Sequence, residues 1–310
     1  MAVDSSTGIS RTRSGSAGSG PRSPLRSVPV DAGNPVPDAV RRPGVRARGI
    51  GGWTGLGRAQ VQTRLDELLA DPDSLSQGGL NLSGPAAFAR TWIRRDPAAF
   101  AEFTLALHDT GRAAIGDHDI DPDPDACPVT DHAALRRQFG HAVPPSTDWM
   151  VLGALRDAEN AVFDYRGDPA DDISALTTPG AMTEWLEATG CWSHVHDEVG
   201  PRFELRLDHA RSLAPSPDTA VLVLVNAGLL LGAGSARAFA QLPTDSLAMF
   251  PYHWLALDSR IVDGPGGVSF DAWSFGAASP NRTVTVPTGA FEQHYYGAVI
   301  AHGRPGETAH

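Results

Sequence analysis

The chain has 310 residues, a net charge of −11 and 41% hydrophobic residues, and all 25 of its basic residues are arginine. This length accommodates one domain of about 200–250 residues with extensions, and the composition suffices for a packed core. The acidic balance argues against a nucleic-acid binder, which requires a basic patch. The absence of lysine has two explanations. One is GC-rich coding, which we favour, and the other is escape from ubiquitination by a toxin delivered into a eukaryotic cell.

Residues 1–50 differ from the rest of the chain in composition. They are rich in Ser, Gly, Pro and Arg, and they carry eight arginines against three aspartates, a net charge of +5. With so few large apolar side chains, this segment cannot offset the entropy of ordering, and we expect it to be a disordered arm. The folded domain is predicted over residues 51–305. The arm is a candidate linker or a loading signal for a secretion or injection apparatus.

The chain shows no pattern typical of the general secretory route or of a membrane span. The N-terminus lacks the apolar run of a signal peptide. The longest apolar stretch begins at Ala220, extends over about 13 residues and falls short of the ~20 that cross a bilayer. We therefore expect a cytoplasmic protein in the producing cell, exported, if at all, by a specialised system.

Apolar residues at helical spacing dominate the first half of the chain. A helix is expected to begin directly after Ser83, where Pro85 suits the first turn. Asp96-Pro97 and Thr178-Pro179 have the composition of helix starts, an N-cap followed by proline. Hydrophobic periodicity predicts further helices over residues 58–70, 97–109, 147–163 and 178–189.

Strand patterns dominate the second half. Continuous aliphatic or alternating runs predict strands over residues 220–225, 252–257, 268–275, 283–286 and 296–301, with a short helix at 288–294. Gly264-Pro265-Gly266-Gly267 predicts a turn between two of these strands. Helices followed by strands indicate an α+β fold, a helical half and then an antiparallel sheet.

Two patterns suggest metal sites, and we give neither much weight. Aspartates alternate in the loop 116–130, but an EF-hand requires Gly at its sixth position and Glu at its twelfth, where Pro122 and Pro128 stand. His194 and His196 share one face of an extended segment without further ligands at defined spacing, which is more typical of a solvated edge. We expect no metal and no cofactor.

Ser83 occupies the position that best suits a nucleophile. A helix N-terminus presents unpaired N–H groups and the positive end of the helix dipole, so it stabilises an anionic nucleophile or oxyanion. Gln77, six residues earlier, offers a side-chain N–H to the same oxyanion. The two cysteines fit the role less well, because Cys127 lies in a loop segment and Cys191 in an apolar one beside Trp192.

The segment from Gln77 to Ala87 resembles the active-site stretch of papain-like cysteine peptidases, in which a glutamine precedes the catalytic cysteine by six residues. In this chain, serine stands at the cysteine position. The run His253-Trp254-Leu255-Ala256-Leu257 resembles the strand that carries the catalytic histidine in that family, and the next strand supplies Asp271. The resemblance covers about residues 58–302 and implies a papain-like fold.

The resemblance also implies a role for each residue. Ser83 holds the nucleophile position, His253 is general base and then acid, Asp271 orients the imidazole, and Gln77 completes the oxyanion hole. Other candidates for the third role are Asp258, which strand alternation points to the face opposite His253, and more weakly Asn281 and Ser274.

The arm, the missing signal peptide and the single domain together resemble bacterial effectors and polymorphic toxins of the papain-like superfamily. The expected function is therefore a papain-like hydrolase scaffold, a peptidase or amidase acting on a protein or peptide, delivered as an effector or toxin. Serine at position 83 makes it weak or inactive. Two alternatives remain: a catalytically dead papain-like module that binds through the same groove, and a structural cargo or adaptor protein whose basic arm is the functional part.

Overall fold

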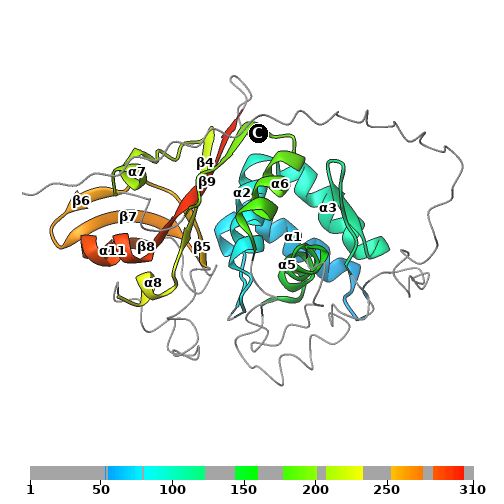
Figure 1. The fold of residues 1–310 in the computed structure, drawn as a ribbon. Coiled ribbons are helices and arrows are strands. Elements are labelled where there is room, and N and C mark those ends of the chain that lie inside the picture. The colour runs from blue at the N-terminus through cyan, green and yellow to red at the C-terminus, as the bar shows by residue number, and fades with distance from the viewer. Residues whose placement is uncertain are drawn as a thin grey trace, which may run out of the picture. The chain divides into compact units, whose positions relative to one another are not determined.

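Figure 1 shows the computed structural model of the chain, which describes residues 53, 55–78, 80–122, 144–159, 177–200, 207–232, 253–274 and 282–303. The chain divides into two units, residues 1–46 and 47–310, and every described residue belongs to the second. The predicted disordered arm over residues 1–50 lies outside the described residues. No helix of the described part is both long and apolar enough to cross a bilayer.

The first half of the described chain is mainly helical, as hydrophobic spacing predicts. Its helices are α1 (Arg58–Ala70), the short 3₁₀ helix η2 (Pro72–Ser74), α2 (Ser83–Arg95), α3 (Pro97–Thr110), α5 (Ser146–Ala158) and α6 (Pro179–Ala188). The predicted helix over 58–70 is confirmed at both ends, and the one over 97–109 differs by one residue. The end of the helix predicted over 147–163 lies outside the described residues.

Side-chain caps explain where two of these helices begin. The Asp96 carboxylate accepts the Ala99 N–H at 2.9 Å, and Thr178 Oγ1 accepts the Ala181 N–H at 3.1 Å. Each cap is followed by proline, whose missing N–H costs nothing in the first turn. Gly111 ends α3 with φ of 80°, the left-handed conformation that favours glycine. Both predicted N-caps are therefore confirmed.

The described residues of the second half build a seven-stranded sheet in which every pairing is antiparallel. Its order is β3 (Trp192–Asp197), β9 (Tyr295–Gly303), β4 (Thr219–Val225), β5 (His253–Leu257), β7 (Gly267–Trp273) and β6 (Val262–Gly264), with β8 (Arg282–Val286) also paired to β7. The strands predicted over 220–225, 283–286 and 296–301 are confirmed. The protein thus combines helices with an antiparallel sheet.

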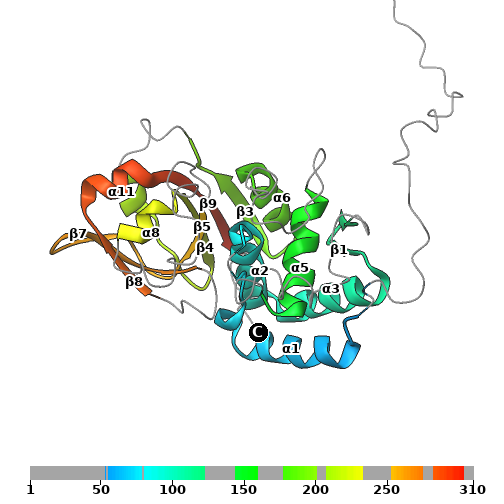
Figure 2. The ribbon, with the colours of Figure 1, turned by 90° about the horizontal axis from the view of Figure 1, so that it is seen from below.

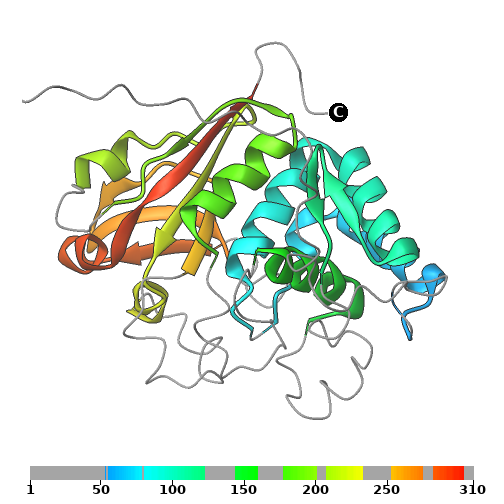
Figure 3. The ribbon, with the colours of Figure 1, turned by 45° about the vertical axis from the view of Figure 1, so that its right-hand side comes forward.

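The sheet separates two hydrophobic clusters. Along β5, Trp254 and Ala256 belong to the cluster that contains the apolar residues of α2, whereas Leu255 and Leu257 belong to the other cluster. Figures 1, 2 and 3 show the helices α1, α2, α3, α5 and α6 on one side of the sheet, and α7 (Leu207–Ser212), α8 (Gly228–Gly232) and α11 (Thr288–His294) on the other. Strand alternation therefore decides which layer each side chain of β5 faces.

One segment that the sequence predicts as a loop contains regular structure. The strands β1 (Ala113–Ile115) and β2 (His118–Ile120) form a hairpin whose turn contains Gly116, with φ of 57°. Ile115 and Ile120 are completely buried. These two residues pack the hairpin against the helical layer. Two apolar residues are too few to give the alternating pattern by which a strand is predicted from sequence. Residues 123–130 of the predicted loop lie outside the described residues.

Candidate active site at the start of helix α2

Ser83 is the first residue of α2, and it lies where this helix meets strand β5. The residue is 6% exposed. Its Oγ accepts a hydrogen bond from the Trp254 backbone N–H at 3.2 Å. Trp254 directly follows His253, so the fold brings the Ser83 segment next to the histidine-bearing strand across 170 residues of sequence. The backbone N–H groups of the first helical turn and the Trp254 N–H are donors that favour negative charge at this position.

The Trp254 side chain holds a second segment against the start of α2. Its Nε1 donates to the Thr177 carbonyl oxygen at 3.0 Å. Thr177 in turn lies so close to Gly84 that a Cβ on Gly84 would be 2.3 Å from the threonine side chain. Glycine at position 84 therefore permits the close approach of residue 177 to the helix. Both Ser83 and Thr177 are buried as a result.

Gln77 is buried, but its amide donates within its own loop. Its Nε2 binds the Leu80 carbonyl oxygen at 2.9 Å. Its Oε1 is buried and has no hydrogen-bond partner among the described residues. In this arrangement the glutamine N–H stabilises the turn into α2, and it would have to leave Leu80 to stabilise an oxyanion at Ser83.

A buried ion pair fixes the loop that carries Gln77. Asp148 of α5 is completely buried and accepts two bonds from Arg64, at 2.8 and 2.9 Å, and one from the Ser76 N–H at 2.9 Å. Arg64 also donates to the Ser74 carbonyl oxygen at 2.7 Å. Hydrogen bonding to Asp148 raises the pKa of Arg64 above its ordinary value. The pair therefore ties α1 and α5 to the backbone just before Gln77.

His253 begins strand β5, and its imidazole interacts with Ser274. Its Nε2 lies 2.7 Å from the Ser274 Oγ. Strand alternation places His253 on the side of Leu255 and Leu257, the sheet face opposite the one covered by α2. Burial lowers the pKa of His253 to about 3, so the ring is neutral at physiological pH. A base with so low a pKa is poorly matched to proton abstraction near pH 7.

Asp271 lies on β7, and its described contacts are with neighbouring strands and turns. Its carboxylate accepts the Thr283 hydroxyl at 2.5 Å, and its backbone N–H donates to the Ser259 Oγ at 2.7 Å. Asp271 alternates with Phe270 and Ala272, which face the same cluster as Leu255. It therefore points to the opposite face from His253, and Ser274, the weaker sequence candidate, is the residue that contacts the imidazole.

Asp258, the competing candidate for the third role, is part of a separate network. Its carboxylate accepts two bonds from Arg90 at 3.0 Å and one from Arg94 at 2.9 Å. Its position confirms the expectation that it points to the face opposite His253, toward α2. Asn281 lies outside the described residues.

The histidines of β3 share a face with one from the neighbouring strand. The ring centroids of His194 and His196 are 6.2 Å apart, and those of His196 and His302 are 5.7 Å apart. Within the described ranges, no group of three or more His, Cys, Asp or Glu residues has an arrangement that could hold a metal ion. Burial raises the pKa of the Cys191 thiol, which makes it a poor nucleophile, and Cys127 lies outside the described residues.

Comparison with known proteins returned no match. No family model, no curated protein and no solved structure is similar to the chain. The geometry of the candidate site stabilises negative charge at Ser83, while the described contacts of the imidazole direct it to Ser274.

Proposed function

We propose that this chain is a papain-like hydrolase scaffold that binds a peptide or protein and, with serine at position 83, turns it over little or not at all. The observation that supports this proposal is the hydrogen bond from the Trp254 N–H to Ser83 Oγ at the start of α2. It joins the nucleophile position to the His253 strand, as the sequence resemblance implies, and it leaves the hydroxyl in the role of acceptor.

The weakness of the serine follows from what activates a hydroxyl. A serine needs an adjacent general base that accepts its proton as it attacks. The imidazole of His253 is buried and neutral, binds Ser274 and lies on the opposite sheet face. A thiol in the same place would depend less on that base, because it ionises near neutral pH and a helix N-terminus stabilises its anion.

The experiment that tests this proposal converts Ser83→Cys in the full chain and measures iodoacetamide labelling of residue 83 as a function of pH. We expect an apparent thiol pKa below the value of about 8.5 for a free cysteine, because the helix N-terminus and the Trp254 N–H both favour the thiolate. The unmodified chain gives the background labelling of Cys127 and Cys191. A pKa at or above 8.5 would show that residue 83 is not a nucleophile position.

A second variant tests whether His253 acts on residue 83, as it would in an active hydrolase. Adding His253→Ala to Ser83→Cys should change the thiol pKa little, because the imidazole is neutral and faces away from α2. Loss of most of the reactivity would instead show that His253 serves residue 83 directly. That result would favour an active papain-like hydrolase over a scaffold that only binds its peptide or protein.

The same proposal includes delivery as a bacterial effector or toxin, which rests on the composition of residues 1–50 and needs no cofactor. Expression of the Ser83→Cys variant in the target cell should arrest growth, whereas the unmodified chain should not. Growth arrest by both forms would contradict the silent role of serine. If neither form arrests growth, the proposal that the chain is a toxin is wrong.

A further inference from the structure

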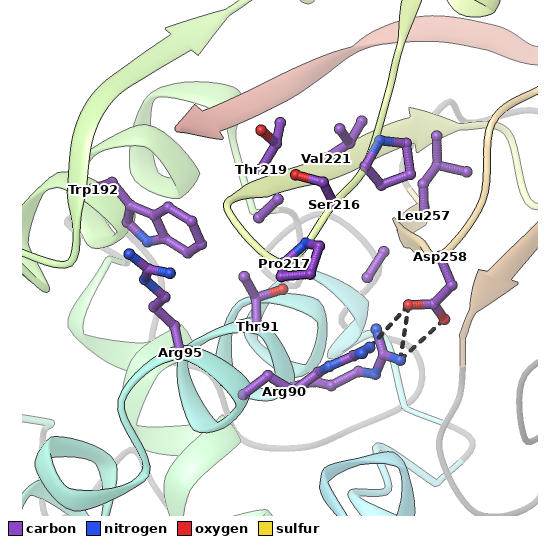
Figure 4. A pocket seen from close by; sticks show the side chains of 14 residues that line it. Arg90, Thr91, Arg95, Trp192, Ser216, Pro217, Thr219, Val221, Leu257 and Asp258 are labelled. Atoms are coloured by element: carbon purple, nitrogen blue, oxygen red, sulfur yellow. Dashed lines mark hydrogen bonds and ion pairs between the residues drawn. The ribbon is translucent and has the colours of Figure 1, made fainter. Parts of the chain in front are cut away.

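A pocket lies at the opposite end of α2 from Ser83. It has a volume of about 430 Å³, within the range typical of small-molecule sites, and lies between the last turns of α2, the segment Pro215–Pro217 and the strands β4 and β5. Figure 4 shows the side chains that line it. Arg95 lies twelve positions after Ser83 on the helix, which corresponds to about 18 Å along the axis. The pocket is therefore distinct from the proposed nucleophile position.

Three arginines of α2 line the pocket, and two of them share Asp258 as their ion-pair partner. Arg90 is almost completely buried, and it binds Asp73 through Nε at 2.6 Å and both oxygens of Asp258 through Nη2 at 3.0 Å. Arg94, whose side chain is 53% exposed, binds the same Asp258 at 2.9 Å. Figure 4 shows the bonds to Asp258 at one end of the pocket. Two carboxylates thus compensate the charge of Arg90.

Arg95 differs from Arg90 in how much of its charge is compensated. Its side chain is only 6% exposed, and it makes a single bond at 3.1 Å to Asp218, which is itself 64% exposed. A guanidinium has five N–H donors in a planar fork that matches a carboxylate or phosphate. Among the described residues, that one bond at the protein surface is the only hydrogen bond to the Arg95 side chain. The buried cation therefore retains donors for a second acceptor.

The walls around Arg95 are mixed, with hydroxyls from Thr91, Ser216 and Thr219 beside the apolar side chains. Its guanidinium lies over the Trp192 ring at 5.3 Å from the centroid, which fixes the orientation of the fork. Figure 4 shows Trp192 and Arg95 together at one side of the pocket, with Pro217 and Val221 also among its lining residues. Ala220 and Ala256, which lie on the sheet face that α2 covers, add to the apolar surface of the pocket. A ligand body placed there would bury apolar area on binding.

We propose that this pocket binds a small organic anion, with its carboxylate or phosphate monoester on Arg95 and its apolar body against Trp192, Pro217 and Ala220. Asp258 at the far end repels a second negative charge and sets the orientation of the ligand. Arg94, at the exposed rim, attracts the anion into the pocket. The site goes beyond the proposed function, because it does not use Ser83.

The test is isothermal titration of the full chain with benzoate, phenyl phosphate and inorganic phosphate. Both aromatic anions should bind, and phenyl phosphate should bind about tenfold more tightly than inorganic phosphate because its ring buries apolar area. The ratio of benzoate to phenyl phosphate affinity distinguishes a carboxylate site from a phosphate site. Equal affinity for phenyl phosphate and inorganic phosphate, or no binding of either aromatic anion at millimolar concentration, would overturn the proposal.

Substitutions of arginine test whether Arg95 is the residue that binds the anion. Arg95→Gln should weaken phenyl phosphate binding at least about tenfold, and Arg95→Lys should weaken it less, because it keeps the charge but loses the fork. Arg94→Gln changes an exposed residue, so it should fold normally and weaken binding by a smaller factor. Arg58→Gln is the matched control, since Arg58 is half exposed and pairs with Asp109 on the protein surface. Equal affinity in all four variants would contradict the assignment.

Discussion

The two ends of α2 are both buried, but the polar side chains there, Ser83 and Arg95, differ in their hydrogen-bond partners. At the N-terminal end, Ser83 is packed against β5, and its hydroxyl accepts a backbone N–H bond. At the C-terminal end, Arg95 is almost as buried, yet a single bond to an exposed carboxylate compensates its charge. Burial alone therefore does not decide how a position on α2 can act, because the hydrogen-bond partners at its two ends differ.

The largest expected effect concerns the ion pair that anchors the N-terminal end. Asp148→Ala removes the only carboxylate that contacts both Arg64 and the Ser76 N–H in the described part of the chain. We expect a loss of about 3 kcal/mol in the free energy of unfolding, the low end for a broken buried pair, because Arg64 keeps the exposed Glu67 as its other ion-pair partner. Urea denaturation measures it. Asp66→Ala, on the exposed side of α1, is the control and should change stability by less than about 0.5 kcal/mol.

The buried histidine predicts a pH dependence of stability. The pKa of His253 is about 3 in the folded state and 6.5 for an ordinary histidine, so the unfolded state binds more protons between these values. Stability should therefore fall as the pH falls from 6.5 toward 3, by about 1.4 kcal/mol per pH unit from this group. Denaturation curves of the chain and of His253→Gln between pH 4 and 7 measure the difference. Parallel curves would contradict the neutral imidazole.

A smaller effect tests the packing at the start of α2. Gly84→Ala places a methyl group 2.3 Å from the Thr177 side chain and must displace that segment. We expect a loss of about 1–3 kcal/mol in the free energy of unfolding, typical of overpacking. Gly289→Ala, where a methyl group meets no atom within 4 Å, should be neutral or slightly stabilising. Thermal unfolding of the two variants compares them, and equal melting temperatures would show that residue 177 moves freely.

Local patterns predicted most of the elements but not the orientation of the site. The spacing of apolar residues located α1, α2 and α3, and the aliphatic runs located β4 and β9. Which face of β5 carries His253 depends on the register between strands, since a shift of one residue reverses every side chain. Asp271 and Ser274 are three positions apart, so their side chains point to opposite faces of the sheet. Ser274 shares the face of His253 and is therefore the one that contacts the imidazole.

The arginine pocket was missed, although part of its signal is local. Arg90, Arg94 and Arg95 lie four and five positions apart on a helix of an acidic chain, a pattern that places them near one another. Trp192 and the segment 215–217 join them only through the sheet, about a hundred residues later. Sequence spacing can therefore indicate a basic helix end, but it cannot show which residues form the walls of a pocket.

In the proposed function, serine at position 83 leaves the nucleophile position silent. The most direct measurement is labelling of the full chain with a fluorophosphonate, which reacts with activated serine hydroxyls, followed by mass spectrometry of the peptide that contains Ser83. We expect no labelling above that of the Ser83→Ala variant, because the Ser83 hydroxyl accepts the Trp254 N–H and the His253 imidazole binds Ser274. Stoichiometric modification of Ser83 that is lost in His253→Ala would contradict it and would identify an active serine hydrolase.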